Sequence, residues 1–477
     1  MANKNSVLIV ISIPFWRNAR YLISSQIYKE LKGKYDLLLV GPMCDQKPFQ
    51  EEFGGKDVSF YNFNESEEHL NSTLKFLYHV SEALRRLGYY FRNRKGKMKY
   101  YWNSTIDPSN SDKNKTAVSS KIYKYKILLL GIFGYFKYTW RILDYLFGSW
   151  IFDTCKIYQS TDNYKYVVLV QTANWGYQER FLAYFSRKYT CRTILVPYTT
   201  DQTTINGYMI SDFDKICAQG PIEKYFLTQL HDVPEEKITS LGMLWLRNYE
   251  FLSNSLRLKP EEKNKPIRKI LYAGLAPDSF PRESEFLAIN KIMESINNGV
   301  IPKAKLVYRP VHLNENEKYM LEQKYRDNNF FEIQLPQTSM IGISEKETVS
   351  IASEIESYIQ QINDVDLMVM SATTTMAFEM WHKGVPCIAN FTDTTGTLAK
   401  KGFTTSYIEQ DAFLTEAKGM LISFTLEEMI TLINISLKDP KNTAGIAASA
   451  LSAWDYDNKY YIEDFIEIIE GLKKQEI

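Results

Sequence analysis

Residues 364–390 have the sequence DVDLMVMSATTTMAFEMWHKGVPCIAN, in which an apolar run, a hydroxyl-rich turn and a helix-like segment follow one another. The run 367–370 has the length of a buried strand. Small polar side chains follow it where a helix would begin, and the first backbone N–H groups of a helix have no partner within the helix. Such a helix end binds anions. The sequence therefore predicts a phosphate site that includes Ser371, Thr373, Thr374 and Thr375.

Glu379 follows Thr375 by one helical turn. Residues four apart lie on the same side of a helix, so we expect the carboxylate to face the same site and to accept hydrogen bonds from vicinal sugar hydroxyls. Gly384 and Pro386 end the helix before a second apolar run at 387–389. The alternative is an ordinary strand-turn-helix unit of an α/β domain, in which hydroxyl caps and Gly-x-Pro breaks are common.

The Ser/Thr turn, the glutamate and the Gly-Val-Pro, in this order, resemble the donor-nucleotide site of GT-B glycosyltransferases. These α/β enzymes have two Rossmann-like domains with a cleft between them and move a sugar from a nucleotide sugar to an acceptor. Within that superfamily the segment most resembles transferases of bacterial surface polysaccharides such as capsule and the O-antigen of lipopolysaccharide. The resemblance implies that the turn holds phosphate and that Glu379 holds the nucleotide ribose.

The length of 477 residues exceeds one typical core, so we expect two domains. We expect a cytoplasmic protein, because the sequence shows neither a signal peptide nor a bilayer-spanning run. The chain has 57 Lys and Arg against 56 Asp and Glu, which gives no general reason to expect nucleic acid as a partner. Its five cysteines and five histidines form no ligand cluster, so we expect reduced thiols and no metal. The first apolar run lacks a signal-peptide cleavage site. The longest uncharged apolar run, 127–136, is about half of the roughly 20 residues that span a bilayer.

Alternating strand and helix patterns predict a mainly parallel sheet in each domain. We expect an N-terminal, acceptor-binding Rossmann-like domain at 1–250, with a basic and aromatic insertion at about 85–152. A C-terminal, donor-binding Rossmann-like domain is expected at 251–477. The turn after the first strand, IPFWRNAR at 13–20, has no glycine fingerprint, which counts against a dehydrogenase.

Two more strand ends of the second domain offer donor ligands, because the carboxyl edge of a parallel sheet faces the ligand. The turn at 273–285 combines a glycine, which permits close backbone approach, with a serine and an arginine that could contact phosphate. The next strand ends in Arg-Pro-Val-His, where the planar guanidinium could chelate a diphosphate. The histidine resembles those beside the nucleotide in many polysaccharide transferases, but is shifted by one residue. Plain surface turns are the alternative for Gly274, Ser279, Arg282, Arg309 and His312.

No convincing Asp-x-Asp motif ends a strand, so helix dipoles and cations must balance the charge on the departing phosphate. We therefore expect a metal-independent reaction with no cofactor beyond the nucleotide sugar as co-substrate. Retaining GT-B enzymes often have a second glutamate eight residues before the ribose-binding one, and here that position is Ser371. The absence of this second glutamate favours inversion.

Inversion requires a general base on the acceptor hydroxyl, which we expect in the first domain. Asp201, in the turn after the strand RTILVPY, is the first candidate, and Glu179, near the start of the preceding helix, is the second. Each acid could instead be a helix-end charge or a surface residue. The expected acceptor contacts are Arg17, Arg20, Asn174, Trp175 and Tyr177.

Residues 85–102 contain seven basic side chains and no acidic one, interleaved with aromatic rings, and the apolar segment 124–152 follows. Aromatic rings and cations are typical of contact with an anionic membrane surface. We expect peripheral docking on the inner face of the cell membrane, near a lipid-linked glycan acceptor. A buried helix pair is the alternative for 124–152. Nucleic-acid binding is not expected, since no RNA-binding module surrounds the patch.

The sequence thus predicts a glycosyltransferase that moves a sugar from a nucleotide sugar to a surface glycan. A sugar-nucleotide epimerase of the same architecture and a non-catalytic scaffold that binds glycan or membrane are the alternatives.

Overall fold

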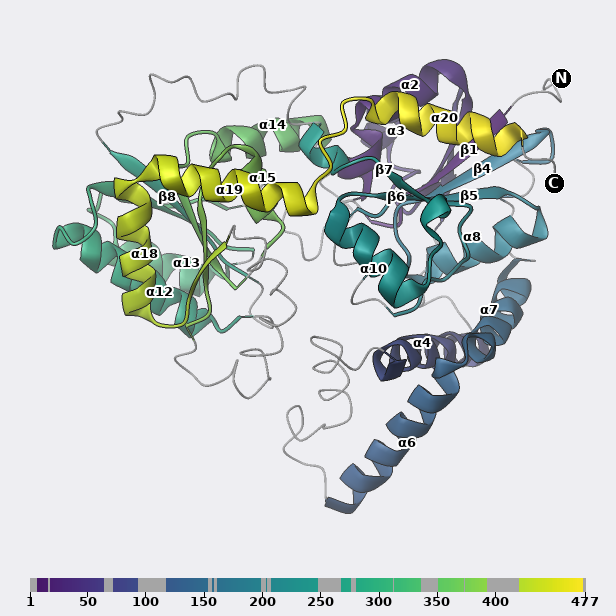
Figure 1. The fold of residues 1–477 in the computed structure, drawn as a ribbon, viewed down its shortest axis with the longest axis horizontal. Helices are drawn as coiled ribbons and strands as arrows, with labels where there is room; N and C mark the ends of the chain where they lie inside the picture. The colour runs from purple at the N-terminus through teal and green to yellow at the C-terminus, as the bar shows by residue number, and fades with distance from the viewer. Residues whose placement is uncertain are drawn as a thin grey trace. The chain divides into compact units, whose positions relative to one another are not determined.

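The structure, a computed structural model, describes residues 7–15, 18–63, 72–92, 117–152, 157, 161–198, 203, 207–247, 267–275, 280–311, 313–335, 351–372, 374–392 and 420–474. The chain divides into two compact units. Unit 1 comprises Met1–Asn248 and Asp455–Ile477, and unit 2 comprises Tyr249–Trp454. Each unit is built on a parallel sheet, so the predicted fold class of two Rossmann-like α/β units is confirmed (Figure 1).

The sheet of unit 1 has the strand order β3-β2-β1-β4-β5-β6-β7, and every pair is parallel. Its strands are nearly continuous apolar runs, as expected for a parallel sheet that is covered on both faces. They are β1 (Val7–Ser12), β2 (Asp36–Gly41), β3 (Val58–Asn62), β4 (Tyr166–Gln171), β5 (Arg192–Leu195), β6 (Lys215–Ala218) and β7 (Ile238–Ser240).

The helices around this sheet include the predicted helix after β4, which the structure places at α8 (Tyr177–Lys188). After β1 the chain forms a short π-helix, η1 (Ala19–Ile23), and then a separate helix, α2 (Gln26–Lys34). The Ser25 side chain caps α2 by accepting from the N–H of Tyr28 at 3.4 Å, which explains the break. The others are α3 (Lys47–Phe53), α10 (Pro221–His231) and η5 (Glu235–Lys237).

The last helix, α20 (Tyr461–Lys474), belongs to unit 1, whereas the expected C-terminal domain ran from 251 to 477. The Tyr35 hydroxyl, just after α2, donates to the Glu470 carboxylate at 2.5 Å. Four apolar side chains of α20 are buried at helical spacing: Phe465, Ile468, Ile469 and Leu472. Burial of this apolar face accounts for the return of the chain to the first unit.

Between β3 and β4, the described residues of unit 1 include three helices, which are α4 (Ser72–Arg92), α6 (Ala117–Tyr135) and α7 (Lys137–Phe152). Helices α4 and α6 cross at two glycines. A Cβ atom on Gly88 would lie 2.0 Å from the carbonyl carbon of Gly134, and one on Gly134 would lie 1.9 Å from the carbonyl oxygen of Leu84. The two backbones therefore touch, which requires that both positions lack a side chain.

The Gly88→Ala substitution is expected to lower the free energy of unfolding by roughly 1–3 kcal/mol, because the helices must separate to admit the methyl group. Gly33→Ala is the matched control, since Gly33 is also helical but a Cβ there meets nothing within 4 Å. Alanine should be neutral or stabilising at that position. Urea unfolding followed by circular dichroism measures both changes. Equal stability of the two variants would contradict the close crossing.

The sheet of unit 2 has the order β10-β9-β8-β11-β12-β13, again parallel throughout. Its strands are β8 (Arg268–Ala273), β9 (Ala304–Arg309), β10 (Phe331–Ile333), β11 (Leu367–Ser371), β12 (Cys387–Asn390) and β13 (Met420–Ser423). The accompanying helices are α12 (Arg282–Asn297), α13 (Glu315–Lys324), α14 (Ile351–Ile362), α15 (Met376–His382), α18 (Leu426–Lys438) and α19 (Pro440–Trp454).

The core of unit 2 follows from the two-residue period of its strands. Alternate residues such as Ile270 and Leu306 pack with Ile289 of α12 and Ile433 of α18. The intervening residues, such as Met368, are also buried, so both sheet faces are covered. The four described cysteines are buried and free, in agreement with the expectation of reduced thiols: Cys44, Cys191, Cys217 and Cys387.

Candidate functional site

The sheet of unit 2 has a topological switch point between β8 and β11. From β8 the chain moves outward to β9 and β10, and from β11 it moves the opposite way to β12 and β13. The loops at the carboxyl ends of β8 and β11 therefore diverge, and ligands of open α/β sheets bind at such a place. The predicted turn, 371–375, follows β11 directly.

The backbone of this turn has an unusual conformation. Ala372 has φ of 51°, in the left-handed region that residues with a Cβ rarely adopt. Its N–H donates to the carbonyl of Asn390 at 2.9 Å, which holds the turn to β12. The Ser371 hydroxyl lies 3.1 Å from that of Tyr272 on β8. The strand end is thus fixed to both of its neighbours.

The threonines before α15 do not cap it strongly. Thr375 is the N-cap residue and makes no side-chain capping bond. The Thr374 hydroxyl accepts from the N–H of Met376 only at 3.5 Å. Hydroxyls that a helix N-terminus does not use for capping are suited to an anion, together with the N–H groups of the first turn.

Three side chains from three different elements are linked to one another, and one of them belongs to α15, the helix that follows this turn. The Tyr358 hydroxyl, on α14, donates to the carboxylate of Glu379 on α15. The guanidinium of Arg309, at the end of β9, lies 5.1 Å from the centre of the Tyr358 ring and donates to the Gln361 side chain. Tyr358 and Glu379 are only 6% and 8% exposed, so packing fixes their positions. The structure therefore joins two sequence-predicted ligands, Arg309 and Glu379, through a tyrosine.

Arg282, which follows the turn after β8, is bonded to side chains of its own unit. This guanidinium donates to the buried Glu285 carboxylate at 2.5 Å and to the Tyr308 hydroxyl at 2.8 Å. Glu285 also accepts from the N–H of Leu275 at 2.7 Å. A Cβ on Gly274 would lie 2.9 Å from the same carboxylate. Gly274 thus makes room for a side chain of its own unit, and Arg282 is paired with an internal carboxylate.

Several predicted residues lie outside the described residues, namely Arg17, Asp201, Ser279, His312 and Thr373. Arg20 lies in η1, where the structure describes its backbone.

The second candidate base, Glu179, lies in a closed polar network of unit 1. Its carboxylate accepts from the Ser12 hydroxyl at 2.5 Å and from the Gln171 amide. The Gln178 amide donates to the Ser12 hydroxyl at 2.7 Å. Glu179 is fully buried, and burial raises its pKa from 4.5 to about 8. A raised pKa suits a general base, but a carboxylate enclosed on all sides cannot reach an acceptor hydroxyl in this conformation.

The remaining acceptor candidates lie at the switch point of the first sheet, between β1 and β4. Asn174 is buried there, and Trp175 stacks on Phe15 at 4.8 Å between ring centres. Tyr177 instead points into the core, where its ring contacts Phe63 at 5.8 Å. Trp175 thus packs on Phe15 at this sheet edge, and Tyr177 packs against the core of unit 1.

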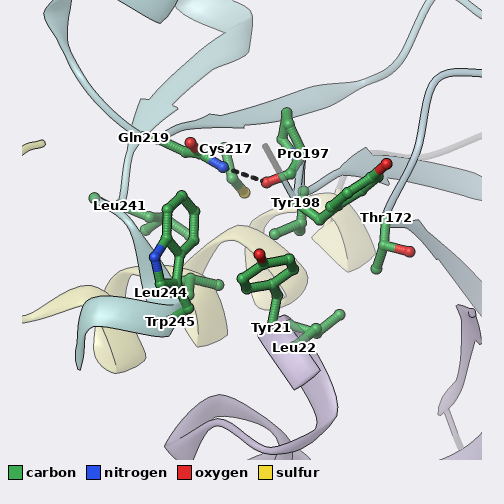
Figure 2. Close-up of a pocket in the computed structure, with 12 residues that line it drawn as sticks. Tyr21, Leu22, Thr172, Pro197, Tyr198, Cys217, Gln219, Leu241, Leu244 and Trp245 are labelled. Atoms are coloured by element: carbon green, nitrogen blue, oxygen red, sulfur yellow. Dashed lines mark hydrogen bonds between the residues drawn. The ribbon is translucent and has the colours of Figure 1, made fainter. Parts of the chain in front are cut away.

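A pocket in unit 1 lies at the carboxyl ends of β4 to β7 (Figure 2). Tyr21 stacks on Tyr198 at 5.8 Å and approaches Trp245 at 4.9 Å. The Gln219 amide closes one side by donating to the carbonyl of Pro197 at 2.5 Å. The cavity between these side chains has a volume of about 10 Å³, which is room for roughly one water molecule, so in this conformation the rings pack against one another and leave no space for a sugar.

The sequence analysis did not identify the residues that support Arg309, nor the rings that line the pocket of unit 1. Tyr358 and Gln361 are three apart on α14, so the same face of one helix presents both to Arg309. An amphipathic helix just before the predicted strand 367–370 was the available signal. The rings of Tyr21, Tyr198 and Trp245 come from distant positions, and no local pattern brings them together.

No family model matches the chain, and no curated protein matches it. Among solved structures, it is similar to the UDP-GlcNAc 2-epimerase from Methanocaldococcus jannaschii, with 12% identity, a TM-score of 0.49, and coverage of 98% of this chain and 99% of that one. It is also similar to MurG from Acinetobacter baumannii, with 9% identity, a TM-score of 0.45, and coverage of 98% and 99%. A glycosyltransferase from Rickettsia africae ESF-5 has 9% identity and a TM-score of 0.47, with 99% and 100% covered. Similarity at this level assigns neither a family nor a reaction.

Proposed function

We propose that this chain is a glycosyltransferase whose unit 2 binds a nucleotide-sugar donor. The observation that carries the proposal is the contact of Arg309 with Tyr358 and of Tyr358 with Glu379, a residue one helical turn after the Ser/Thr turn at the switch point of the second sheet. A cation, a fixed carboxylate and a hydroxyl-rich turn are the groups that a diphosphate and a ribose require. The turn follows β11 at the sheet edge where ligands of this architecture bind.

Each group has a distinct part in the proposed site. The guanidinium of Arg309, oriented by the Tyr358 ring and by Gln361, binds the diphosphate. The turn of Ser371, Thr374 and Thr375 holds the same phosphates from the other side, and Glu379 accepts hydrogen bonds from the ribose hydroxyls. The cation and the turn stabilise the charge on the departing diphosphate, so the proposed reaction is metal-independent.

The acceptor belongs to unit 1 in this proposal, with Asp201 as the general base of an inverting transfer. Glu179 is the second candidate, and its enclosure favours a supporting role over direct proton transfer. In the sequence, Arg17 and Arg20 follow β1, and Asn174 and Trp175 follow β4. A surface glycan or a lipid-linked glycan would be held there. Action at the inner face of the cell membrane is part of the same proposal.

Two measurements on the full chain test this function. In a thermal-shift panel of UDP, GDP, CDP, CMP and dTDP, a nucleotide at 100 times its Kd should stabilise the protein by about 2.7 kcal/mol. The matching radiolabelled nucleotide sugar should then transfer its label to a glycan or lipid-linked fraction. Conversion of the donor to an epimer without transfer would make the protein an epimerase. A nucleotide shift in none of the five cases would favour a scaffold without a donor site.

Glu379→Gln is expected to weaken binding of the nucleotide from this panel about tenfold, since a neutral amide replaces a charged acceptor at the ribose. Isothermal titration measures the change. Glu322→Gln is the matched control, because Glu322 is exposed on α13 of the same unit. An unchanged Kd for the nucleotide in Glu379→Gln would show that this carboxylate does not bind the ribose.

A further inference from the structure

Helices α6 and α7 of unit 1 carry an exposed apolar stripe. They run end to end and α6 extends beyond the sheet of that unit (Figure 1). The exposed positions recur at spacings of three and four residues, so they lie along one side of each helix. Seven of these side chains are between 54% and 79% exposed: Tyr125, Leu129, Phe133, Phe136, Tyr138, Ile142 and Tyr145. Contiguous exposed patches of this kind mark interaction sites.

The opposite side of the two helices is firmly packed, which fixes the direction of the stripe. On α6, Gly134 lies directly against α4. On α7, Trp140 and Phe147 are buried. The Asp144 carboxylate is also buried, accepts from the Ser81 hydroxyl at 2.5 Å and pairs with Arg180 of α8 at 2.8 Å. The exposed side therefore faces away from the core because the other side is held by α4 and α8.

The charges on these helices are one-sided. Residues 117–152 contain five basic residues, Lys121, Lys124, Lys126, Lys137 and Arg141, and a single acidic one. That acidic residue is Asp144, which is buried and already paired with Arg180. The stripe of aromatic and aliphatic side chains thus lies on helices whose only carboxylate is internal. Lys126 is exposed on α6, whereas Arg141 of α7 is paired with Asp212 at 2.7 Å.

We propose that the stripe on α6 and α7 is a docking surface for an anionic lipid bilayer. Tyrosine and phenylalanine rings settle at the level of the lipid headgroups, and lysines beside them attract anionic lipids. Among the described helices none is long and apolar enough to cross a membrane. In the proposed contact, α6 and α7 lie in the interface with their apolar side towards the acyl chains. The surface stands independently of the nucleotide site. It extends the proposed function by naming where a lipid-linked acceptor is met.

Self-association is a poorer explanation of the same surface. In a two-fold dimer the stripe would meet its own copy, because the same patch forms both sides of such an interface. Residues 117–152 of each copy contain five basic residues and no exposed carboxylate, so the charges of the two copies would repel. An anionic bilayer supplies the missing negative charge.

Sedimentation with vesicles tests the proposal on the full chain without any nucleotide. The protein should bind vesicles of phosphatidylcholine with phosphatidylglycerol, bind pure phosphatidylcholine less, and dissociate as salt is added. The combined variant Phe133→Ser, Phe136→Ser and Tyr138→Ser should lose at least about tenfold in partition coefficient. Tyr319→Ser is the control, because Tyr319 is 62% exposed on α13 of unit 2.

A second variant tests the charge of the surface separately from its apolar side chains. Lys126→Glu reverses one charge of the surface and should lower binding to anionic vesicles about tenfold, with little change on neutral ones. Failure of the wild-type protein to bind anionic vesicles would overturn the proposal. A concentration-dependent dimer in analytical ultracentrifugation that the triple variant abolishes, without vesicle binding, would assign the stripe to a second copy instead. Neither result depends on whether the protein binds nucleotides.

Discussion

Arg309→Ala is expected to weaken the binding of a nucleoside diphosphate about 100-fold, which is the loss of one strong contact to a charged group. The guanidinium is held against the Tyr358 ring at 5.1 Å and by Gln361, so it is oriented before a ligand arrives. A preorganised cation costs less conformational entropy on binding than a mobile one. Isothermal titration with the tightest-binding nucleotide of the panel measures the change, and the thermal shift should nearly vanish.

Two further variants separate charge from geometry at this position. Arg309→Lys retains the positive charge but loses the planar group that matches a diphosphate, so we expect an intermediate affinity. Arg326→Ala is the matched control, because Arg326 is an exposed arginine of the same unit. Wild-type affinity in Arg309→Ala would place the diphosphate elsewhere and end the case for a donor site at the ends of β9 and β11.

The parts of this site that the sequence predicts are those with a local signal. The run 367–370 and the hydroxyls after it indicate a strand that ends in a turn, and β11 with α15 confirms that order. Arg309 was placed at a strand end because an apolar run precedes it, and β9 ends at that residue. Such features depend on neighbouring residues only, so a single sequence is sufficient.

The remaining features depend on contacts between distant segments. Glu179 is buried because Ser12 and Gln171 approach it from β1 and β4, which are far apart in the chain but adjacent in the sheet. The return of α20 to unit 1 likewise has no local signal. Arg282 is a different case. Glu285 follows it at the i+3 position of the same helix, so the sequence spacing indicates their pairing. This pairing competes with phosphate for the guanidinium.

The enclosure of Glu179 predicts how its replacement changes stability with pH. Burial raises its pKa to about 8, against 4.5 for an exposed glutamate. Between these values the unfolded chain has lost the proton while the folded protein keeps it. The free energy of unfolding therefore falls by about 1.4 kcal/mol per pH unit through this window. Below pH 4.5 both states are protonated, and above pH 8 both are ionised, so the slope from this group vanishes.

Glu179→Gln is expected to remove this slope, since a neutral amide of the same shape neither titrates nor carries charge into the core. The free energy of unfolding of the variant, minus that of the wild-type protein, should rise by on the order of 4 kcal/mol from pH 5 to pH 8. Urea unfolding at several pH values measures the difference. Glu30→Gln, at a half-exposed position on α2, is the control and should leave the difference flat.

The same variant separates a supporting role for Glu179 from a catalytic one. A buried carboxylate that only holds Ser12 and Gln171 can be replaced by glutamine with most of the turnover retained. A general base cannot, because the amide accepts no proton, and its loss costs about 100-fold or more in rate. A folded Glu179→Gln protein with that loss, and a wild-type rate that rises with pH towards 8, would show that the network opens and that Glu179 is the base in place of Asp201.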